Sequence, residues 1–501
     1  MGRVAVAVIV SLWVIPISLM VNHIVPEPYM DEIFHIPQAQ KYCRGNFKSW
    51  DPLITTPPGL YCLSLAHVAS LFPGMWCAKA VSSFSKLCST PTLRSINGVL
   101  AVICSVLVYE ILAYFRPALD KRNTTLRAIV TSLYPLHWFF TFLYYTDVAS
   151  LTLVLAMYLA CLKRHYQSSA LLGALAILVR QTNVIWMLFV ACCGAINLTL
   201  PPNHKVNVQL DDHDAPVRKN DWLPEKKSMP VGPNLRKRKM DSTSISVNHS
   251  IPKMNDLSLR HTSGLLDEIK VILLRMWNLK LEVLVSFGPF FVVFVAFVMF
   301  VFWNGSIVLG AKEAHAVSLH FAQIMYFGLV SALAMAPFYF TYNQVAVLCQ
   351  SLWKNRPLSF FQVIVLLISG FLSVHLFSIA HPYLLADNRH YTFYIWRRVI
   401  KSHWLMKYLL LPLYAYSWLC IFDSLGKVQK KIWVLLFFLA SAGVLIPAPL
   451  IEFRYYTIPF YFLVLHSPID DNRSWDPEVY MVETSIGNAA ENRWALVQAT
   501  T

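Results

Sequence analysis

Charged residues are scarce in this chain of 501 residues: Asp, Glu, Lys and Arg make up 14% of it, against about a quarter in soluble globular proteins. Hydrophobic residues make up 56%. So apolar a composition excludes an ordinary water-soluble protein and indicates a membrane protein. The 31 Phe, 23 Tyr and 15 Trp support this interpretation, because aromatic rings collect at the two interfaces of a bilayer.

Metal-site cysteine patterns are also missing. The ten cysteines form no Cys-x-x-Cys pair and no His/Cys ligand spacing, so neither a zinc site nor a disulfide-built scaffold is indicated. We expect no required cofactor, although this pattern alone does not exclude a metal ion. Cys43, Cys62, Cys77 and Cys88 fall in one predicted loop, where the sequence allows a disulfide but does not define its pairing.

The chain lacks acidic residues relative to basic ones, and its formal net charge is +15. Much of this excess lies in loops between apolar segments, where Lys and Arg keep loops on the cytosolic side. We therefore attribute the charge to membrane topology and expect no nucleic-acid partner. No internal repeat of the solenoid type is present.

The main feature of the sequence is its long apolar runs. A helix that crosses a membrane needs about 20 mostly apolar residues. The qualifying windows are 4–24, 96–115, 127–145, 146–162, 168–183, 184–200, 283–303, 321–340, 359–379, 404–422, 432–450 and a shorter one at 455–466. They predict an all-α polytopic membrane protein with about 11–12 transmembrane helices.

The sidedness of the loops depends on the stretch from Gly59 to Phe72, which is short and follows two prolines. If it crossed the bilayer, the basic loop 116–127 would be lumenal, against the positive-inside rule. We therefore expect an interfacial helix there and a cytosolic N-terminus. The predicted organisation is a first transmembrane helix (1–24), a helical first lumenal loop (25–95), transmembrane helices (96–200), a disordered basic cytosolic loop (201–270), transmembrane helices with a lumenal loop at 380–400 (271–466) and a polar tail (467–501).

Polar residues that cytosolic anchoring does not explain converge on the lumenal side. Asp31 and Glu32 begin a predicted interfacial helix, where either could merely cap the helix N-terminus. Arg180 could simply close a buried turn, and the segment 387–398 could be only a charged loop. Together, however, two carboxylates and several arginines near one membrane face are costly unless they meet an anionic ligand.

Such a set suits glycosyl transfer from a lipid phosphate. One ionised carboxylate can accept the proton of the attacking hydroxyl, and Arg or His can stabilise the phosphate leaving group without a metal. A hydrolase would more naturally place two carboxylates across the sugar, whereas Asp31 and Glu32 are adjacent on one helix.

Six blocks, in chain order, carry a resemblance to a known family: MDEIFHIPQAQ, WDPLITTPPGLY, LVRQTNVIW, FWNGSIVLG, HPYLLADNRHYTFYIWRR and IEFRYYTIP. They resemble the DIE2 family, the terminal α-1,2-glucosyltransferases of N-glycan precursor assembly, from residue 1 to about 466. The resemblance implies a GT-C type fold, in the membrane of the endoplasmic reticulum and active in its lumen. It also implies dolichyl phosphate glucose as donor, a diglucosylated dolichyl-diphosphate oligosaccharide (Glc2Man9GlcNAc2) as acceptor, and inversion at the anomeric carbon.

The resemblance places the essential acid at Asp31, with Glu32 as the second choice. The other predicted site residues bind the carrier phosphate or glycan, line the donor pocket or offer faces to sugars: Arg389, His390, Arg397, Arg398, Arg180, Gln181, Asn183, Asp387, Asn388, Tyr391, Trp50, Asp51, His35, Gln38, Arg454 and Tyr455. His35 and Gln38 could also simply face water. Asn304 is a candidate glycosylation site, although its closeness to the membrane disfavours modification.

Two features and two alternatives stay open at this point. The polar tail from about residue 467 lacks the further apolar segment expected of the family, and the insert 201–270 has no evident mechanistic role. A related dolichyl-phosphate-dependent mannosyltransferase fits the same physics, because pocket shape selects the sugar. A transporter or channel-associated subunit would also carry charges in a membrane, but no inverted repeat is evident.

Overall fold

The computed structural model describes residues 2–71, 87–199, 264–313, 318–354, 356–378, 381 and 391–468, and within these every regular element is a helix. The first part contains α1 (Gly2–Ile24), α2 (Glu32–Cys43), α3 (Gly59–Leu71), α5 (Thr90–Phe115), α6 (Lys121–Ser132), α7 (Pro135–Thr141), α8 (Thr146–Leu162), α9 (Tyr166–Val179) and α10 (Asn183–Thr199). The second contains α11 (Leu265–Asn278), α12 (Lys280–Asn304), α13 (Ala322–Ala334), α14 (Ala336–Tyr339), α15 (Tyr342–Lys354), α16 (Arg356–Leu376), α18 (Tyr391–Ile395), η2 (Trp396–Ile400), α19 (Met406–Leu409), α20 (Leu411–Val428), α21 (Lys431–Leu445), η3 (Phe453–Tyr456) and α22 (Thr457–His466).

These helices confirm the predicted all-α membrane class. Five of the described helices are long and apolar enough to cross a membrane, or six if α7 and α8, bent by 117° at their break, form one span. The remaining predicted windows contain shorter apolar helices, such as α9, α10 and α21. Most windows therefore contain a helix, and five or six helices of the described residues are long enough to be full spans by length and composition.

Two predicted segments differ from the structure. The window 127–145 is not one helix, because α6 ends at Ser132 and α7 starts at Pro135, a residue that cannot donate to a preceding helix turn. The predicted loop 201–270 lies outside the described residues from position 201 to position 263. Its end is helical, because α11 begins at Leu265. The tail beyond Pro468 also lies outside the described residues.

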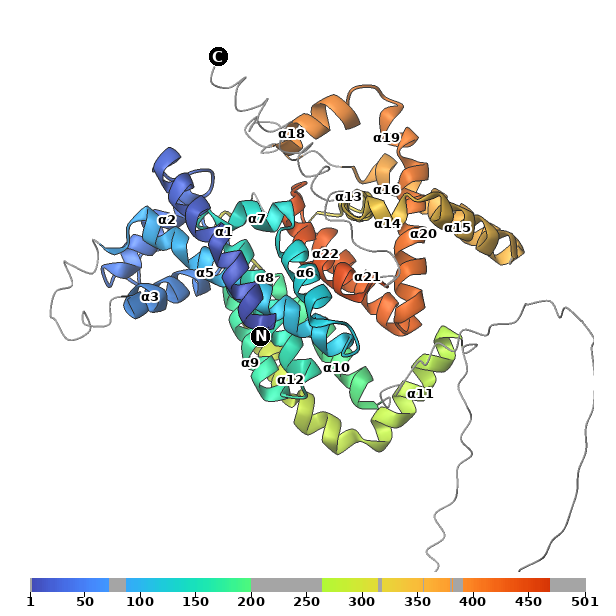
Figure 1. The fold of residues 1–501 in the computed structure, drawn as a ribbon, viewed down its shortest axis with the longest axis horizontal. Helices are drawn as coiled ribbons and strands as arrows, with labels where there is room; N and C mark the ends of the chain where they lie inside the picture. Colours follow the sequence, from blue (N-terminus) through green and yellow to red (C-terminus); the bar gives the residue numbers. More distant parts are fainter. Residues whose placement is uncertain are drawn as a thin grey trace, which may run out of the picture.

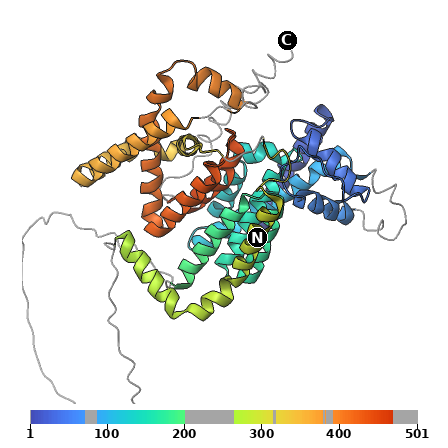
Figure 2. The same cartoon turned by 180° about the vertical axis from the view of Figure 1, so that it is seen from behind.

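The helices form two groups joined by the C-terminal helices. One contains α1, α5, α6, α8, α9, α10 and α12, and the other contains α13, α16 and α20. Helix α22 packs on α5 and α8 of the first group and on α20 of the second. In both Figure 1 and Figure 2 the red helices α21 and α22 lie between the blue-green and orange parts.

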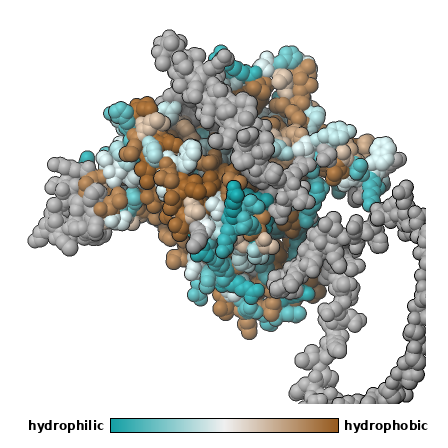
Figure 3. All heavy atoms as spheres, in the orientation of Figure 1, coloured by the Kyte–Doolittle hydropathy of each residue, from teal (hydrophilic) through white to brown (hydrophobic). Residues whose placement is uncertain are grey.

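Helices α1 and α5 run antiparallel along one side of the bundle. Arg94 at the start of α5 donates to Asn22 at the end of α1, while Glu110 near the end of α5 pairs with Arg3 at the start of α1. The outer stripe of α1 is apolar and exposed, at Val4, Val8 and Leu12, and Figure 3 shows hydrophobic surface on that face of the molecule. This is the surface expected where a helix bundle faces lipid.

A disulfide between Cys43 and Cys88 fixes the first loop. It joins the end of α2 to the residue just before the Ser89 that precedes α5, and the Gln40 side chain donates to the Cys88 carbonyl beside it. The sequence left this pairing open. Cys62, by contrast, has a free thiol.

We expect Cys43→Ser to destabilise the folded protein by about 4 kcal/mol, because the disulfide closes a loop of 45 residues in the unfolded chain. Thermal unfolding in detergent, followed with and without reductant, measures this. Cys62→Ser is the matched control and should unfold like the parent. Equal melting temperatures for Cys43→Ser and the parent would contradict the predicted stabilisation.

Candidate active site

Asp31 lies between α1 and α2 with a side chain that remains available. It occupies the N-cap position of α2 but makes no side-chain capping bond, so the alternative that it only caps the helix is not what the structure shows. Its backbone N–H donates to the Tyr145 hydroxyl at 2.6 Å, and its carboxylate, 45% exposed, accepts from Arg454 at 3.2 Å. The carboxylate is therefore fixed in place and still accessible.

The residue before Asp31 holds an unusual backbone conformation. Met30 has φ of +55°, in the left-handed region that side chains with a Cβ disfavour. Its side chain packs against a buried cluster that includes Phe140 and Tyr145. Packing thus holds a strained peptide next to the exposed carboxylate, an arrangement that is frequent at functional sites.

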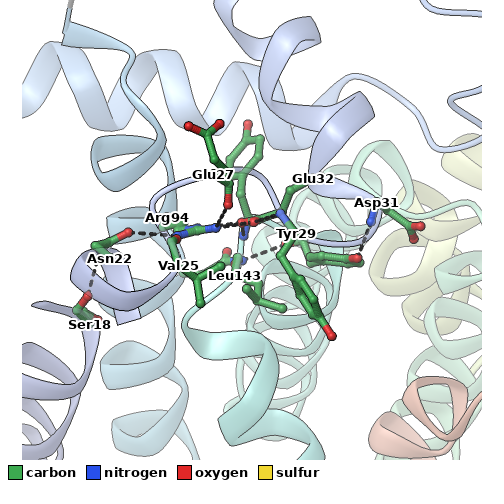
Figure 4. Close-up of polar contacts among 12 residues, drawn as sticks. Ser18, Asn22, Val25, Glu27, Tyr29, Asp31, Glu32, Arg94 and Leu143 are labelled. Carbon is green, nitrogen blue, oxygen red and sulfur yellow. Dashed lines mark hydrogen bonds and ion pairs between the residues drawn. The ribbon is translucent and has the colours of Figure 1, made fainter. Parts of the chain in front are cut away.

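Glu32 has a different environment although it adjoins Asp31. Its side chain is fully buried, and its two oxygens accept from Arg94 Nε at 2.9 Å and Nη2 at 2.6 Å. They also accept the backbone N–H group of Tyr29 at 2.9 Å (Figure 4) and that of Tyr144 at 2.5 Å. Because each Glu32 oxygen already accepts two hydrogen bonds, Glu32 has no free position from which to accept a proton from a substrate.

The Arg94 guanidinium ties three segments together. Besides Glu32, it donates to Asn22 at the end of α1 and to the carbonyls of Val25 and Glu27 in the connection to α2 (Figure 4). All five N–H donors of arginine can be used in such a fork. The pair therefore sets the position of the α1–α2 connection, and with it Asp31.

Arg454 connects the C-terminal segment to this region. Its side chain pairs with Asp31 and with the neighbouring Glu452, and its guanidinium lies over the rings of Tyr145 at 5.9 Å and Tyr455 at 5.7 Å. The turn η3, just before α22, supplies this arginine. Residues more than 400 positions apart in sequence thus form one charged cluster.

A second ion pair adjoins the first through Tyr455. The Arg180 guanidinium lies 5.8 Å from the Tyr455 ring centroid, and its Nη1 is 3.0 Å from Asp147 Oδ1. That approach lacks hydrogen-bond geometry, and within the described part of the chain the buried Asp147 oxygens accept no hydrogen bond. Asp147 is therefore a buried carboxylate with unused acceptor capacity.

His35 is buried beneath these charges and does not face water. Its Nδ1 lies 2.7 Å from the Tyr61 hydroxyl. Burial lowers the pKa of His35 to about 4, partly opposed by the negative charge of Asp31 and reinforced by Arg454. At neutral pH the ring is uncharged, so it can exchange hydrogen bonds but contributes no positive charge toward a phosphate.

Gln38 is also buried, and it supports the neighbouring loop. Its Nε2 donates to the Ser49 carbonyl at 2.7 Å, and its Oε1 accepts from the Asp51 N–H at 3.1 Å. The Asp51 carboxylate accepts the Leu53 N–H, and Trp50 donates through its indole N–H to the Ile54 carbonyl. Both polar ends of Gln38 are thus used within the protein.

The Thr55 carbonyl joins this loop to two distant segments. It accepts from Gln181 Nε2 at 2.5 Å and from the Leu309 N–H at 3.1 Å. Gly310 permits the approach, since a Cβ there would lie 2.3 Å from the Pro52 carbonyl oxygen. Asn304, the candidate glycosylation site in the same segment, donates its side-chain amide to the carbonyls of Ser306 and Val308, each at 2.8 Å.

Two residues predicted to line the donor pocket are used inside the protein instead. Gln181 makes the Thr55 bond, and Asn183 is fully buried, donating to Ser150 and to the Ala176 carbonyl and accepting from Ser150. The junction between α9 and α10 therefore offers Arg180, not its amide neighbours, to the cluster.

The arginine-rich block is described only in part. Asp387, Asn388, Arg389 and His390, with the side chain of Tyr391, lie outside the described residues. Within the described segment, Arg397 lies over the Phe393 ring at 5.9 Å and Arg398 over the Tyr394 ring at 5.4 Å. Among the residues that the structure describes, the ion pair of Asp31 is with Arg454.

An apolar cavity of about 200 Å³ is lined in part by a residue next in sequence to the cluster. It lies between α3 and α9, and Pro58, Leu63, Leu153 and Val179 are among its lining residues. Val179 directly precedes Arg180. None of the described residues that line the cavity is charged, so it suits an apolar group.

Several residues of the cluster were not predicted from the sequence: Arg94, Tyr61, Tyr145, Asp147 and Glu452. A signal existed for Asp147, since an ionisable residue at the head of an apolar window is a candidate functional residue. The tyrosines gave none, because aromatic residues are common throughout the chain. No group of three His, Cys, Asp or Glu side chains suited to a metal is found among the described residues.

The family model described as the DIE2/ALG10 family matches residues 25–465. A relative from Arabidopsis thaliana is 59% identical over 473 residues, covering 93% of this chain and 91% of the relative. Relatives from Homo sapiens and Mus musculus are 35% and 34% identical, each covering 88% of this chain and 84% of the relative. All three are named Dol-P-Glc:Glc(2)Man(9)GlcNAc(2)-PP-Dol alpha-1,2-glucosyltransferase. No solved structure matches the chain.

We expect Glu32→Gln to destabilise the protein by about 3–5 kcal/mol, because it leaves the buried Arg94 charge uncompensated. Thermal unfolding in detergent, compared with Glu282→Gln, measures the effect against the same chemical change on α12. The double variant Glu32→Gln, Arg94→Met should recover part of the loss. A Glu32→Gln protein as stable as the parent would contradict the structural role of this pair.

Proposed function

The chain belongs to the DIE2/ALG10 family, and from this premise we infer that it is a dolichyl-phosphate-glucose-dependent α-1,2-glucosyltransferase. It transfers the terminal glucose to the diglucosylated dolichyl-diphosphate oligosaccharide that precedes N-glycosylation. The observation that carries this conclusion is 59% identity to a relative of that name over nine-tenths of both chains. Helices able to cross a membrane make it a multi-pass membrane protein. The lumen of the endoplasmic reticulum is our proposed side of action.

We propose Asp31 as the general base. Its carboxylate is accessible and uncommitted to capping, whereas every oxygen position of Glu32 is occupied. In the reaction Asp31 takes the proton of the acceptor 2-hydroxyl as that oxygen forms the new bond to the anomeric carbon. The bond from this carbon to the phosphate oxygen breaks, and dolichyl phosphate leaves with the electron pair. A β-linked donor gives an α-linked product in this single displacement.

Positive charge for the leaving phosphate comes, in this proposal, from two sources. Arg454 and Arg180 border Asp31 and Asp147, where acidic neighbours hold them in place. The block containing Arg389, His390, Arg397 and Arg398 remains the proposed second source, with Asp387 and Asn388 as its partners toward the glycan. Arginine suits the role because its planar fork binds phosphate oxygens in pairs.

The remaining groups are assigned to the sugar and the lipid. The unused acceptors of Asp147 suit glucose hydroxyls, and Tyr455, Tyr391 and Trp50 offer ring faces. The apolar cavity that Val179 lines suits the first isoprene units of a dolichyl chain. Five residues stabilise the site through hydrogen bonds within the protein and are not proposed to touch substrate: His35, Gln38, Asp51, Gln181 and Asn183.

The experiment that tests the function offers purified protein two donors, dolichyl phosphate glucose and dolichyl phosphate mannose, with the diglucosylated acceptor. We expect transfer of one glucose in α-1,2 linkage and no transfer of mannose. Mannose transfer would identify the related mannosyltransferase activity instead. Absence of transfer from either donor, with correctly folded protein, would contradict the proposed function.

We expect Asp31→Asn to lower turnover by about 10²–10⁴, because the change removes the proton acceptor while nearly preserving shape. Its melting temperature should stay close to that of the parent, since Asp31 is half exposed. Asp423→Asn, the same change in an ion pair on α20, is the matched control and should keep full activity. Turnover of Asp31→Asn at the parental rate would exclude Asp31 as the base.

A further inference from the structure

A second charged cavity lies at the end of the bundle opposite Asp31. Its volume is about 520 Å³, and its lining includes Arg3, Lys121, Lys163, Glu110 and Tyr109. None of these residues takes part in the transfer reaction. The cavity therefore needs its own explanation.

Two helices show that the two sites lie at opposite ends. Helix α1 starts with Gly2 and Arg3 in the cavity and ends at the connection that carries Asp31. Helix α8 starts with Asp147 at the active site and is followed directly by Lys163 in the cavity. With 23 residues, α1 is about 35 Å long, enough to separate the two sites by the ~30 Å hydrocarbon core of a bilayer.

The cavity carries an excess of positive charge. Glu110, with only 12% of its side chain exposed, pairs with Arg3 and, at 3.2 Å, with Lys163. Three cations and one carboxylate thus line the cavity. Lys121 makes no ion pair among the residues that the structure describes, so at least its charge is left for a ligand. The first backbone N–H groups of α1, which lack intrahelical acceptors, add to the positive potential.

The surroundings of the cavity favour a lipid over a small soluble anion. Val4, Val8 and Leu12 follow the cavity along the outer stripe of α1, with 65%, 51% and 67% of their surfaces exposed. Val6 and Val10, on the other face of the helix, are buried in the core. A molecule with its phosphate in the cavity could therefore lay its acyl chains along this apolar stripe.

We propose that this cavity binds the headgroup of an anionic phospholipid, at the membrane face opposite the active site. Lys121 and Lys163 contact the phosphate, and Glu110 restricts the site by occupying part of the positive charge. Basic pockets at the ends of membrane helices bind phospholipid headgroups by this chemistry. The proposal does not depend on the identity of the transferred sugar.

Native mass spectrometry of the full chain tests the proposal, with dioleoylphosphatidylserine and dioleoylphosphatidylcholine offered at equal concentration in neutral detergent. We expect preferential retention of the serine lipid, and about fivefold less of it for Lys121→Gln, the lysine that makes no ion pair. Lys48→Gln, the same change on an exposed loop at the other end, should retain the lipid like the parent. Equal retention of the two lipids by the parent, or equal losses in both variants, would overturn the site.

Two further arms separate a binding role from a structural one. Glu110→Gln should raise retention of the serine lipid, because it releases two cations, whereas a purely structural Glu110 predicts a loss. Inorganic phosphate at 100-fold excess over lipid should not displace the bound lipid. Displacement would show that the cavity takes free anions, which contradicts a lipid site.

Discussion

The buried pair between Glu32 and Arg94 is the interaction on which the arrangement of the candidate active site depends. Its two charges are 0% and 2% exposed, and each is surrounded by further hydrogen bonds. A buried ion pair gains little net stability over apolar residues, but it tolerates no change in geometry, because either charge left alone is costly. The contribution of this pair is therefore to positioning: it fixes the connection between α1 and α2, and with it the position of Asp31.

The adjacent carboxylates of Asp31 and Glu32 thus lie in different environments. The helix turns by about 100° between neighbouring residues, which directs Glu32 into the bundle toward α5 and leaves Asp31 at the surface of the cluster. Arg454 then reaches Asp31 from the far end of the chain, and Tyr455 links this pair to Arg180 and Asp147. Acidic neighbours hold Arg180 and Arg454 in place, and the Asp31 carboxylate stays accessible.

The sequence predicted the elements of this site better than their connections. Apolar windows located the helices, and the acids of the first loop and Arg180 and Arg454 were recognised as candidates. Two adjacent acids have the same chemistry, so only the burial of Glu32 separates them, and burial depends on the distant Arg94. Likewise Gln181 and Asn183 look like ligand residues until their partners are known, the Thr55 carbonyl in the first loop and groups on α8 and α9. The break of the window 127–145 was readable from Pro135, whereas the Cys43–Cys88 pairing depends on how α2 returns to α5.

The disulfide has a consequence for how the protein can be produced. Helix α2 is anchored at one end by Arg94, in the first turns of α5, and at the other by Cys88, two residues before α5 begins. The second anchor forms only where thiols are oxidised. A reducing bacterial cytoplasm would deliver chains in which α2 is held at one end alone. Recombinant preparations for kinetic work therefore require a host that exposes this loop to an oxidising secretory compartment.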